Sequence, residues 1–241
     1  MKTYFFISDV HLGSHAIHTK KREDRLLSFL DHVEQSGQGL FIVGDLFDFW
    51  FEYRYVIPKD YFSLLCKLKH MVDRGIEIHY LVGNHDFWLS DFFTKTLGVT
   101  VHTDTLDISL NGMKFHLTHG DGLAKNDRGY RLLKKILRNP VNIKLFRLIH
   151  PDFGFMLAGQ SSHASRTLRD VPNHDADYKA YARERFKEGS QAVIIGHTHR
   201  PMKMTENNHF YINTGDWIKH YSYARLAGTE LSLEHWQNSP V

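Results

Sequence analysis

Residues 4–11 read Tyr-Phe-Phe-Ile-Ser-Asp-Val-His, a short apolar run that ends in polar side chains. The apolar part predicts a buried strand that delivers Asp9 and His11 at its carboxyl end. Because Asp9 and His11 are two positions apart, both side chains fall on the same side of an extended segment. Two ligands of one metal ion require that arrangement, so this stretch indicates where the functional residues of the fold lie.

The same pattern, an apolar strand followed by polar residues, occurs four more times along the chain. The polar motifs that follow these strands are Gly44-Asp45, Gly83-Asn84-His85-Asp86, His119-Gly120-Asp121 and Gly196-His197-Thr198-His199. Any one of these motifs is more often a turn or a polar surface. All of them together predict one site, because open α/β sheets bind ligands at the carboxyl ends of their strands.

Strands alternate with helices in the first half of the chain. Apolar residues at helical spacing end at Ser36-Gly37, and a second helix follows Pro58 and stops near Gly75. This alternation predicts a parallel α/β beginning.

In the second half, Asn111-Gly112 separates two stretches in which apolar residues alternate. That pattern predicts a hairpin with a type I′ turn. Further short strands are predicted near residues 210–212, 221–226 and 230–235. We therefore expect two packed sheets flanked by helices, in a single domain over residues 1–241.

Composition sets broad limits on function. The chain has 241 residues and a net charge of +3, which makes no strong electrostatic case for a nucleic-acid partner. Cys66 is the only cysteine, which suggests the cytoplasm, and its apolar helical surroundings predict that it is buried. Residues 1–9 lack the layout of a signal peptide, and no apolar stretch approaches the roughly 18 residues of a transmembrane helix.

The segment between His119 and His197 is predicted to be largely helical. One helix ends at Asn139-Pro140, and further apolar clusters follow over residues 143–149 and 153–157. We expect a helical insertion over residues 123–190, and its pattern fits either an ordinary core or a lid with an apolar groove. The basic side chains beside these apolar residues could lie on anionic headgroups or simply belong to an amphipathic helix; they are Lys134, Lys135, Arg138 and Lys144.

The set of polar motifs resembles the calcineurin-like metallophosphoesterases, whose pattern is D-x-H, G-D, G-N-H-D, a single H and G-H-x-H. That resemblance implies a four-layer αββα sandwich that holds two divalent ions. It implies that one ion is bound by Asp9, His11 and His199, and the other by Asn84, His119 and His197. Asp45 would bridge both ions.

The donor set agrees with this assignment. Carboxylate, imidazole and amide donors suit Mn²⁺, Fe²⁺ or Zn²⁺, and Mn²⁺ is the ion we expect. Two such ions lower the pKa of a bridging water and neutralise phosphoryl oxygens. His85 is the expected further catalytic residue, as an imidazolium that stabilises charge or protonates the leaving oxygen. Asp86 is expected to orient an imidazole, and Asp121 to be structural.

Within that family the chain is similar to the UDP-2,3-diacylglucosamine pyrophosphohydrolases of lipid A synthesis. The similarity rests on Gly44-Asp45-Leu46-Phe47-Asp48, on Asn126-Asp127-Arg128-Gly129-Tyr130 and on His197-Thr198-His199-Arg200-Pro201. It implies a helical lid whose apolar chamber takes acyl chains, and peripheral contact with the cytoplasmic face of the inner membrane. The expected reaction yields UMP and 2,3-diacylglucosamine 1-phosphate.

The same similarity implies a set of substrate contacts: Asn84, His85, Asp127, Tyr130, Ser162, Arg166, Arg169 and His197. On a helix, Ser162, Arg166 and Arg169 would share one face, where the arginines could grip a diphosphate. Better-known members of the subfamily carry arginine where His85 stands here. The alternatives are another phosphodiesterase, a DNA nuclease, or a scaffold without catalysis. The oligomeric state stays open.

Overall fold

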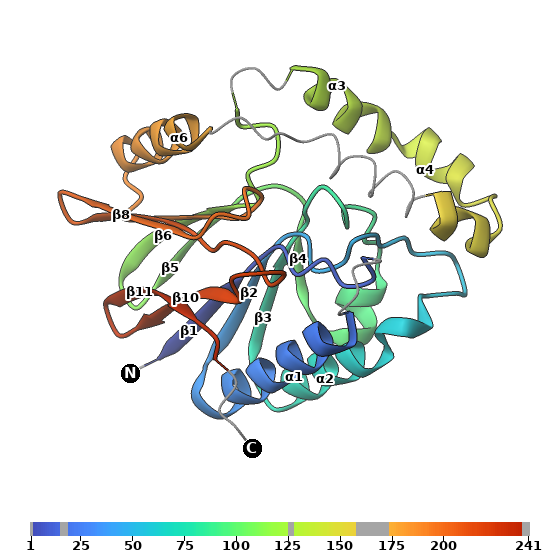
Figure 1. The fold of residues 1–241 in the computed structure, drawn as a ribbon, viewed down its shortest axis with the longest axis horizontal. Helices are drawn as coiled ribbons and strands as arrows, with labels where there is room; N and C mark the ends of the chain where they lie inside the picture. The colour runs from blue at the N-terminus through green and yellow to red at the C-terminus, as the bar shows by residue number, and fades with distance from the viewer. Residues whose placement is uncertain (1, 15–18, 125–127, 158–173, 238–241) are drawn as a thin grey trace.

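The computed structural model describes residues 2–14, 19–124, 128–157 and 174–237, and Figure 1 shows two sheets lying between helices. The first sheet has six strands in the order β11-β10-β1-β2-β3-β4. Its parallel part consists of β1 (Thr3–Ile7), β2 (Gly39–Val43), β3 (Glu77–Leu81) and β4 (Thr100–His102). The strands β10 (Ser222–Ala227) and β11 (Glu230–His235) complete it in antiparallel pairing.

The second sheet has five strands in the order β5-β6-β7-β9-β8. The predicted hairpin joins β5 (Leu106–Leu110) to β6 (Met113–Thr118), and its turn residues Asn111 and Gly112 have φ of 49° and 82°. These left-handed values fit the predicted type I′ turn. The strand β7 (Ala192–Ile195) pairs in parallel with β6, and β9 (His209–Asn213) pairs in parallel with β7. The strand β8 (Met202–Glu206) pairs antiparallel with β9 at the edge of the sheet.

Alternating strand side chains build three apolar layers. In β1, Phe5 and Ile7 pack toward the helices α1 (Thr19–Ser36) and α2 (Phe62–Asp73), whereas Tyr4 and Phe6 point between the sheets. In β7, Val193 and Ile195 instead pack against α6 (Asp175–Lys187). The period of two therefore lets each sheet bury both faces, and the expected four-layer αββα sandwich is confirmed.

Three shorter helical elements lie at the carboxyl end of the strands, at the upper right of Figure 1. They are α3 (Arg128–Leu137), α4 (Pro140–Phe146) and residues 151–157. The predicted break between two helices at Asn139-Pro140 is confirmed. The Asn139 side chain caps α4 by accepting a hydrogen bond from the Val141 amide at 2.8 Å, and Pro140 occupies the first turn of α4.

The short strands β4 and β8 were not expected, and the expectation that Cys66 is buried was wrong. Cys66 is exposed. The buried stripe of α2 consists of Leu64, Leu65, Leu68 and Met71. Cys66 lies about 100° of helical rotation from Leu65, on the side that faces solvent.

Phe6 joins the two sheets and should dominate stability. Its ring is fully buried, stacks on Phe41 at 4.9 Å and lies 5.7 Å from Phe115 of the second sheet. We expect Phe6→Ala to lower the free energy of unfolding by about 3–5 kcal/mol, since it leaves a cavity between the sheets. Urea denaturation measures this loss. The control is Phe62→Ala, whose ring is 69% exposed and whose removal should change stability by less than about 0.5 kcal/mol. Equal losses would contradict the assignment of the core.

Candidate metal centre

The five motif-bearing loops meet at one end of the sandwich. They follow β1, β2 and β3 of the first sheet and β6 and β7 of the second. The loops also bond to one another: the Val10 amide donates to the Asp45 carbonyl at 2.8 Å, and the Gly196 amide donates to that of His119 at 3.0 Å. Residues far apart in the sequence are thereby brought together.

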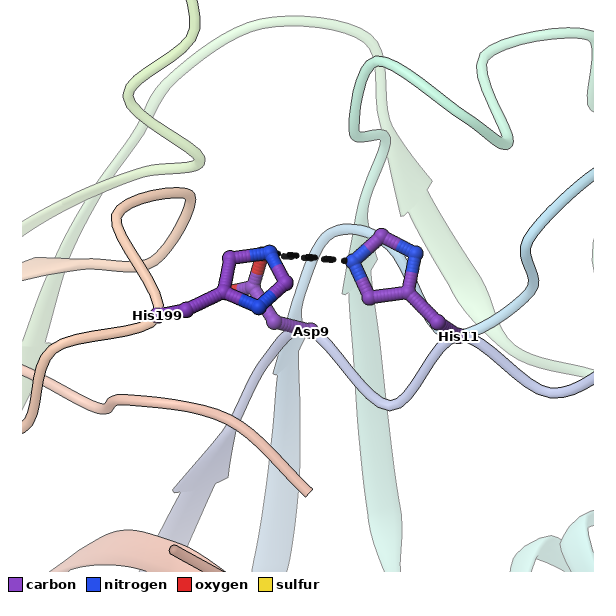
Figure 2. Close-up of side chains that lie close together, drawn as sticks. All are labelled: Asp9, His11 and His199. Atoms are coloured by element: carbon purple, nitrogen blue, oxygen red, sulfur yellow. Dashed lines mark hydrogen bonds and ion pairs between the residues drawn. The ribbon is translucent and has the colours of Figure 1, made fainter. Parts of the chain in front are cut away.

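The first group consists of Asp9, His11 and His199 (Figure 2). The Nε2 atoms of the two imidazoles are 3.2 Å apart, and His199 Nε2 is 3.4 Å from Asp9 Oδ1. That oxygen is buried and accepts no hydrogen bond from any residue that the structure describes. A buried carboxylate oxygen without a donor fits a site for a cation.

The second group consists of Asp45, His119 and His197. His119 Nε2 lies 3.3 Å from Asp45 Oδ2 and 3.1 Å from Asn84 Oδ1. The same Asp45 oxygen is 3.7 Å from His11 Nε2 in the first group. Asp45 therefore lies between the two groups, and all seven residues that were expected to bind metal converge here.

The backbone reaches this arrangement by an unexpected route. Asp9, His11, Asp45, His197 and His199 have φ between 49° and 67°, in the left-handed region. The expectation that Asp9 and His11 lie on an extended segment was wrong, although both side chains do belong to the first group, whereas His197 and His199 are divided between the two groups. Left-handed residues other than glycine persist only where the surrounding structure holds them, and such strain clusters at functional sites.

Outer partners orient the imidazoles. His119 Nδ1 bonds the Val43 carbonyl at 2.9 Å, and since a carbonyl only accepts, Nδ1 carries the proton and Nε2 offers its lone pair to the group. His11 Nδ1 lies 3.4 Å from Asp48 Oδ1, and His199 Nδ1 lies 4.0 Å from Asp216 Oδ2. No role was expected for Asp48 or Asp216. Gly215-Asp216 follows β9 and repeats the pattern of a strand followed by Gly-Asp, a signal that could have revealed it.

The carboxylates draw positive charge into the centre. Burial opposes ionisation of Asp9, but the neighbouring His199 and His11 outweigh it and hold the Asp9 pKa at about 2. Burial likewise opposes protonation of His119, but the Asp45 carboxylate outweighs burial and raises the pKa of His119 to about 10. Burial and the charge of His119 lower the pKa of His197 to about 3. The buried carboxylates therefore favour positive charge in the centre. That charge can be a proton on an imidazole or a metal ion that displaces the proton.

His85 lies beside the first group. Its amide donates to Asp45 Oδ1 at 2.9 Å, its Nδ1 bonds the Asp48 carbonyl at 3.0 Å, and its ring is 4.8 Å from that of His11. Burial, together with the charge of His11, lowers the pKa of His85 despite the nearby carboxylates. This environment favours a neutral imidazole rather than the expected imidazolium. A catalytic role for His85 stays a prediction.

Asp86 has a different role from the one expected. Its fully buried carboxylate accepts from the amides of Leu46 at 2.7 Å and Gly83 at 2.8 Å, and from the Tyr80 hydroxyl. Burial, reinforced by the nearby Asp45, raises its pKa to about 6. Asp86 therefore joins the loops after β2 and β3 and does not orient an imidazole.

Only some of the residues that were predicted to contact substrate lie in the part of the chain that the structure describes. Asn84, His85 and His197 lie in the centre, and the Tyr130 ring is 6.5 Å from that of His197. Asp127, Ser162, Arg166 and Arg169 lie outside the described residues. Asp121 binds Tyr130 and Lys134, in keeping with its expected structural role.

Both the fold and the centre point to one class of enzyme. Residues 2–201 match the family model for the calcineurin-like phosphoesterases, and the chain belongs to that family. Members are hydrolases that use divalent metal ions.

The chain is also similar to curated relatives named UDP-2,3-diacylglucosamine hydrolase. The one from Porphyromonas gingivalis is 35% identical, with 97% of each chain covered. The one from Neisseria meningitidis serogroup B is 31% identical, over 94% of this chain and 93% of the relative. The one from Nitrosococcus oceani is 29% identical, over 88% and 86%.

Gly83 should be irreplaceable, because a Cβ there would lie 2.0 Å from Asp45 Oδ1. We expect Gly83→Ala to displace Asp45 and lower metal-dependent turnover of bis(p-nitrophenyl) phosphate roughly a hundredfold, as misplacement by about 1 Å does. Metal content measured on the same samples should fall too. Gly129→Ala is the control, since a Cβ there meets nothing within 4 Å. Full activity in Gly83→Ala would contradict the placement of Asp45.

Proposed function

We propose that this chain hydrolyses the pyrophosphate of UDP-2,3-diacylglucosamine, releasing UMP and 2,3-diacylglucosamine 1-phosphate in lipid A synthesis. The relatives' names support this substrate, and the converged centre supports the chemistry. The observation that carries the proposal is an apolar surface that faces solvent beside the metal centre, on α3, α4 and residues 148–157. A nucleotide substrate with acyl chains needs both features side by side.

The seven converged residues would hold two divalent ions, for which we propose Mn²⁺, and their mixed carboxylate, imidazole and amide donors also suit Fe²⁺ or Zn²⁺. Asp9, His11 and His199 would bind one ion, Asn84, His119 and His197 the other, and Asp45 both. When bound, the ions supply an activated water and neutralise phosphoryl charge. The chain itself contributes placement. The Val43 carbonyl fixes the ring of His119 by a hydrogen bond, and the Asp48 carboxylate lies 3.4 Å from Nδ1 of His11. Asn84, His85 and Tyr130 would line the approach to the diphosphate.

The amphipathic pattern of α3 is inverted. Tyr130, Lys134 and Arg138 point toward the loops of the centre, where they make polar contacts. The apolar residues Leu132, Leu133 and Ile136 are 62%, 48% and 50% exposed. Apolar exposure continues through Val141, Leu145, Leu148, Phe153, Met156 and Leu157. Exposed apolar side chains that are concentrated in one segment favour a place where lipid or a partner binds.

We propose that residues 128–157, within the expected insertion over 123–190, act as the lid. Its underside packs on the body of the protein through Phe146, whose ring lies 4.8 Å from that of Phe51 and 4.9 Å from that of Trp88. At the far end of the insertion, α6 buries Tyr178 and Ala182 against the second sheet, so α6 is part of the sandwich.

Purified enzyme should release UMP from UDP-2,3-diacylglucosamine, and a chelator should abolish that release until Mn²⁺ is restored. In ¹⁸O-water the label should enter UMP, because water is expected to attack the UMP-side phosphorus. Asp45→Asn should lose at least about a thousandfold in rate, as expected when a charge that serves both ions is removed. Hydrolysis of DNA or simple diesters without turnover of the nucleotide lipid would favour the phosphodiesterase and nuclease alternatives.

The exposed apolar lid surface also supports peripheral contact with the cytoplasmic face of the inner membrane. Lys144 lies exposed beside Leu145 on α4, where it would meet anionic headgroups. Among the residues that the structure describes, no helix is long and apolar enough to cross a bilayer.

Leu148 offers the test, as its side chain is 82% exposed. Leu148→Glu should weaken flotation with phosphatidylglycerol vesicles roughly tenfold, since about 1.5–3 kcal/mol of apolar burial is lost. Phe62→Glu is the matched control, because Phe62 is an exposed apolar residue on α2, outside residues 128–157. Equally strong flotation of the wild-type protein, Leu148→Glu and Phe62→Glu would contradict membrane contact through the lid.

A further inference from the structure

The inward face of α3 contacts the loop that carries His119. Asp121 follows His119 by two residues, and its side chain is only 5% exposed. The Tyr130 hydroxyl donates to Asp121 Oδ2 at 2.9 Å, and Lys134 Nζ lies 2.7 Å from the same oxygen. Tyr130 and Lys134 are four positions apart on α3, so both reach a single acceptor from one helix face.

The next helical turn contacts the loop that carries Asn84. Arg138 donates to the Gly83 carbonyl at 3.4 Å and to the Thr103 carbonyl at 3.2 Å. The Trp88 indole donates to the carbonyl of Leu137 at 3.0 Å. Thus α3 is attached to both of the loops that carry Asn84 and His119.

The strongest of these contacts is the ion pair. A nearly buried carboxylate requires a charged partner, and Lys134 supplies one at hydrogen-bonding distance. The same Asp121 oxygen accepts the hydrogen bond of the Tyr130 hydroxyl, and the Tyr130 ring lies 6.5 Å from that of His197.

We propose that Lys134 is a positioning residue, whose ion pair with Asp121 latches α3 to the metal centre and holds Tyr130 over its second group. The latch serves a substrate large enough to reach the lid, so this inference rests on the proposed function. A small diester needs the metal centre alone and gains nothing from the latch.

The test compares Lys134→Met with Lys95→Met on two substrates. Lys95 forms an exposed ion pair with Asp91 at 2.9 Å, in the helical turn Phe92–Leu97, and is the control for loss of a paired lysine. We expect Lys134→Met to lower kcat/KM for UDP-2,3-diacylglucosamine roughly ten- to a hundredfold, as misplaced contacts do. Turnover of bis(p-nitrophenyl) phosphate should stay within about twofold, and Lys134→Arg should restore most of the loss. Tyr130→Phe should cost little more once Lys134 is replaced, because the two side chains act together.

Hydrogen exchange gives a readout that does not depend on the substrate. Amides of α3 should exchange faster in Lys134→Met and at the wild-type rate in Lys95→Met. Equal losses on both substrates would mean that Lys134 supports the metal loops, and unchanged exchange would mean that α3 is not latched; either result overturns the inference. If wild-type enzyme does not turn over the nucleotide lipid, the proposed function fails, whereas exchange still decides whether the latch exists.

Discussion

The structure depends on two carboxylates, Asp9 and Asp45, that are buried within reach of the same imidazole. His11 Nε2 lies 3.8 Å from Asp9 and 3.7 Å from Asp45. Desolvating such charges costs about several kcal/mol each, so positive charge has to be present between them. The surrounding architecture meets this demand: left-handed backbone turns both carboxylates inward, and Gly83 and Gly196 leave room directly behind them. The buried Asp86 then holds the loops after β2 and β3 together through their amides.

The positions of these residues could be predicted because the rule that places them is local. An apolar strand followed by Gly-Asp or His-x-His can be recognised in a single stretch, and parallel register brings all such ends to one edge. Local pattern does not show how each imidazole is held. Asp48 and Asp216 act on ring nitrogens of residues far away in the sequence, and the left-handed φ of Asp9 and His199 arises from contacts between loops. Short edge strands such as β4, with three residues, carry too little periodicity to be recognised.

The lid shows a second limit of pattern alone. A helix with an apolar stripe ordinarily turns that stripe toward a core, and the sequence left both a core and a groove open. In α3 the polar face is the buried one, because Asp121 and the carbonyls of Gly83 and Thr103 require donors at that distance. Those acceptors belong to loops distant in sequence. The direction in which an amphipathic helix faces is set by its partners, and only the fold identifies them.

This inversion separates chemistry from selectivity within one chain. A metal centre of this kind would recognise only a phosphoryl group, which many substrates share, and the residues that could hold its ions all follow strands of the sandwich. In the proposed function, selection of a lipid would fall to the apolar face of α3 and α4, where Leu132 and Leu145 are more than half exposed. A lid that presented this surface on a loosely held helix would gain little, because ordering it would consume the binding energy. Because the polar face of α3 is already fixed to the loops of Asn84 and His119, the free-energy cost of ordering the helix does not have to be met when substrate binds. Hence the same helix would both present the proposed lipid-binding surface and hold it in a fixed position relative to the metal centre.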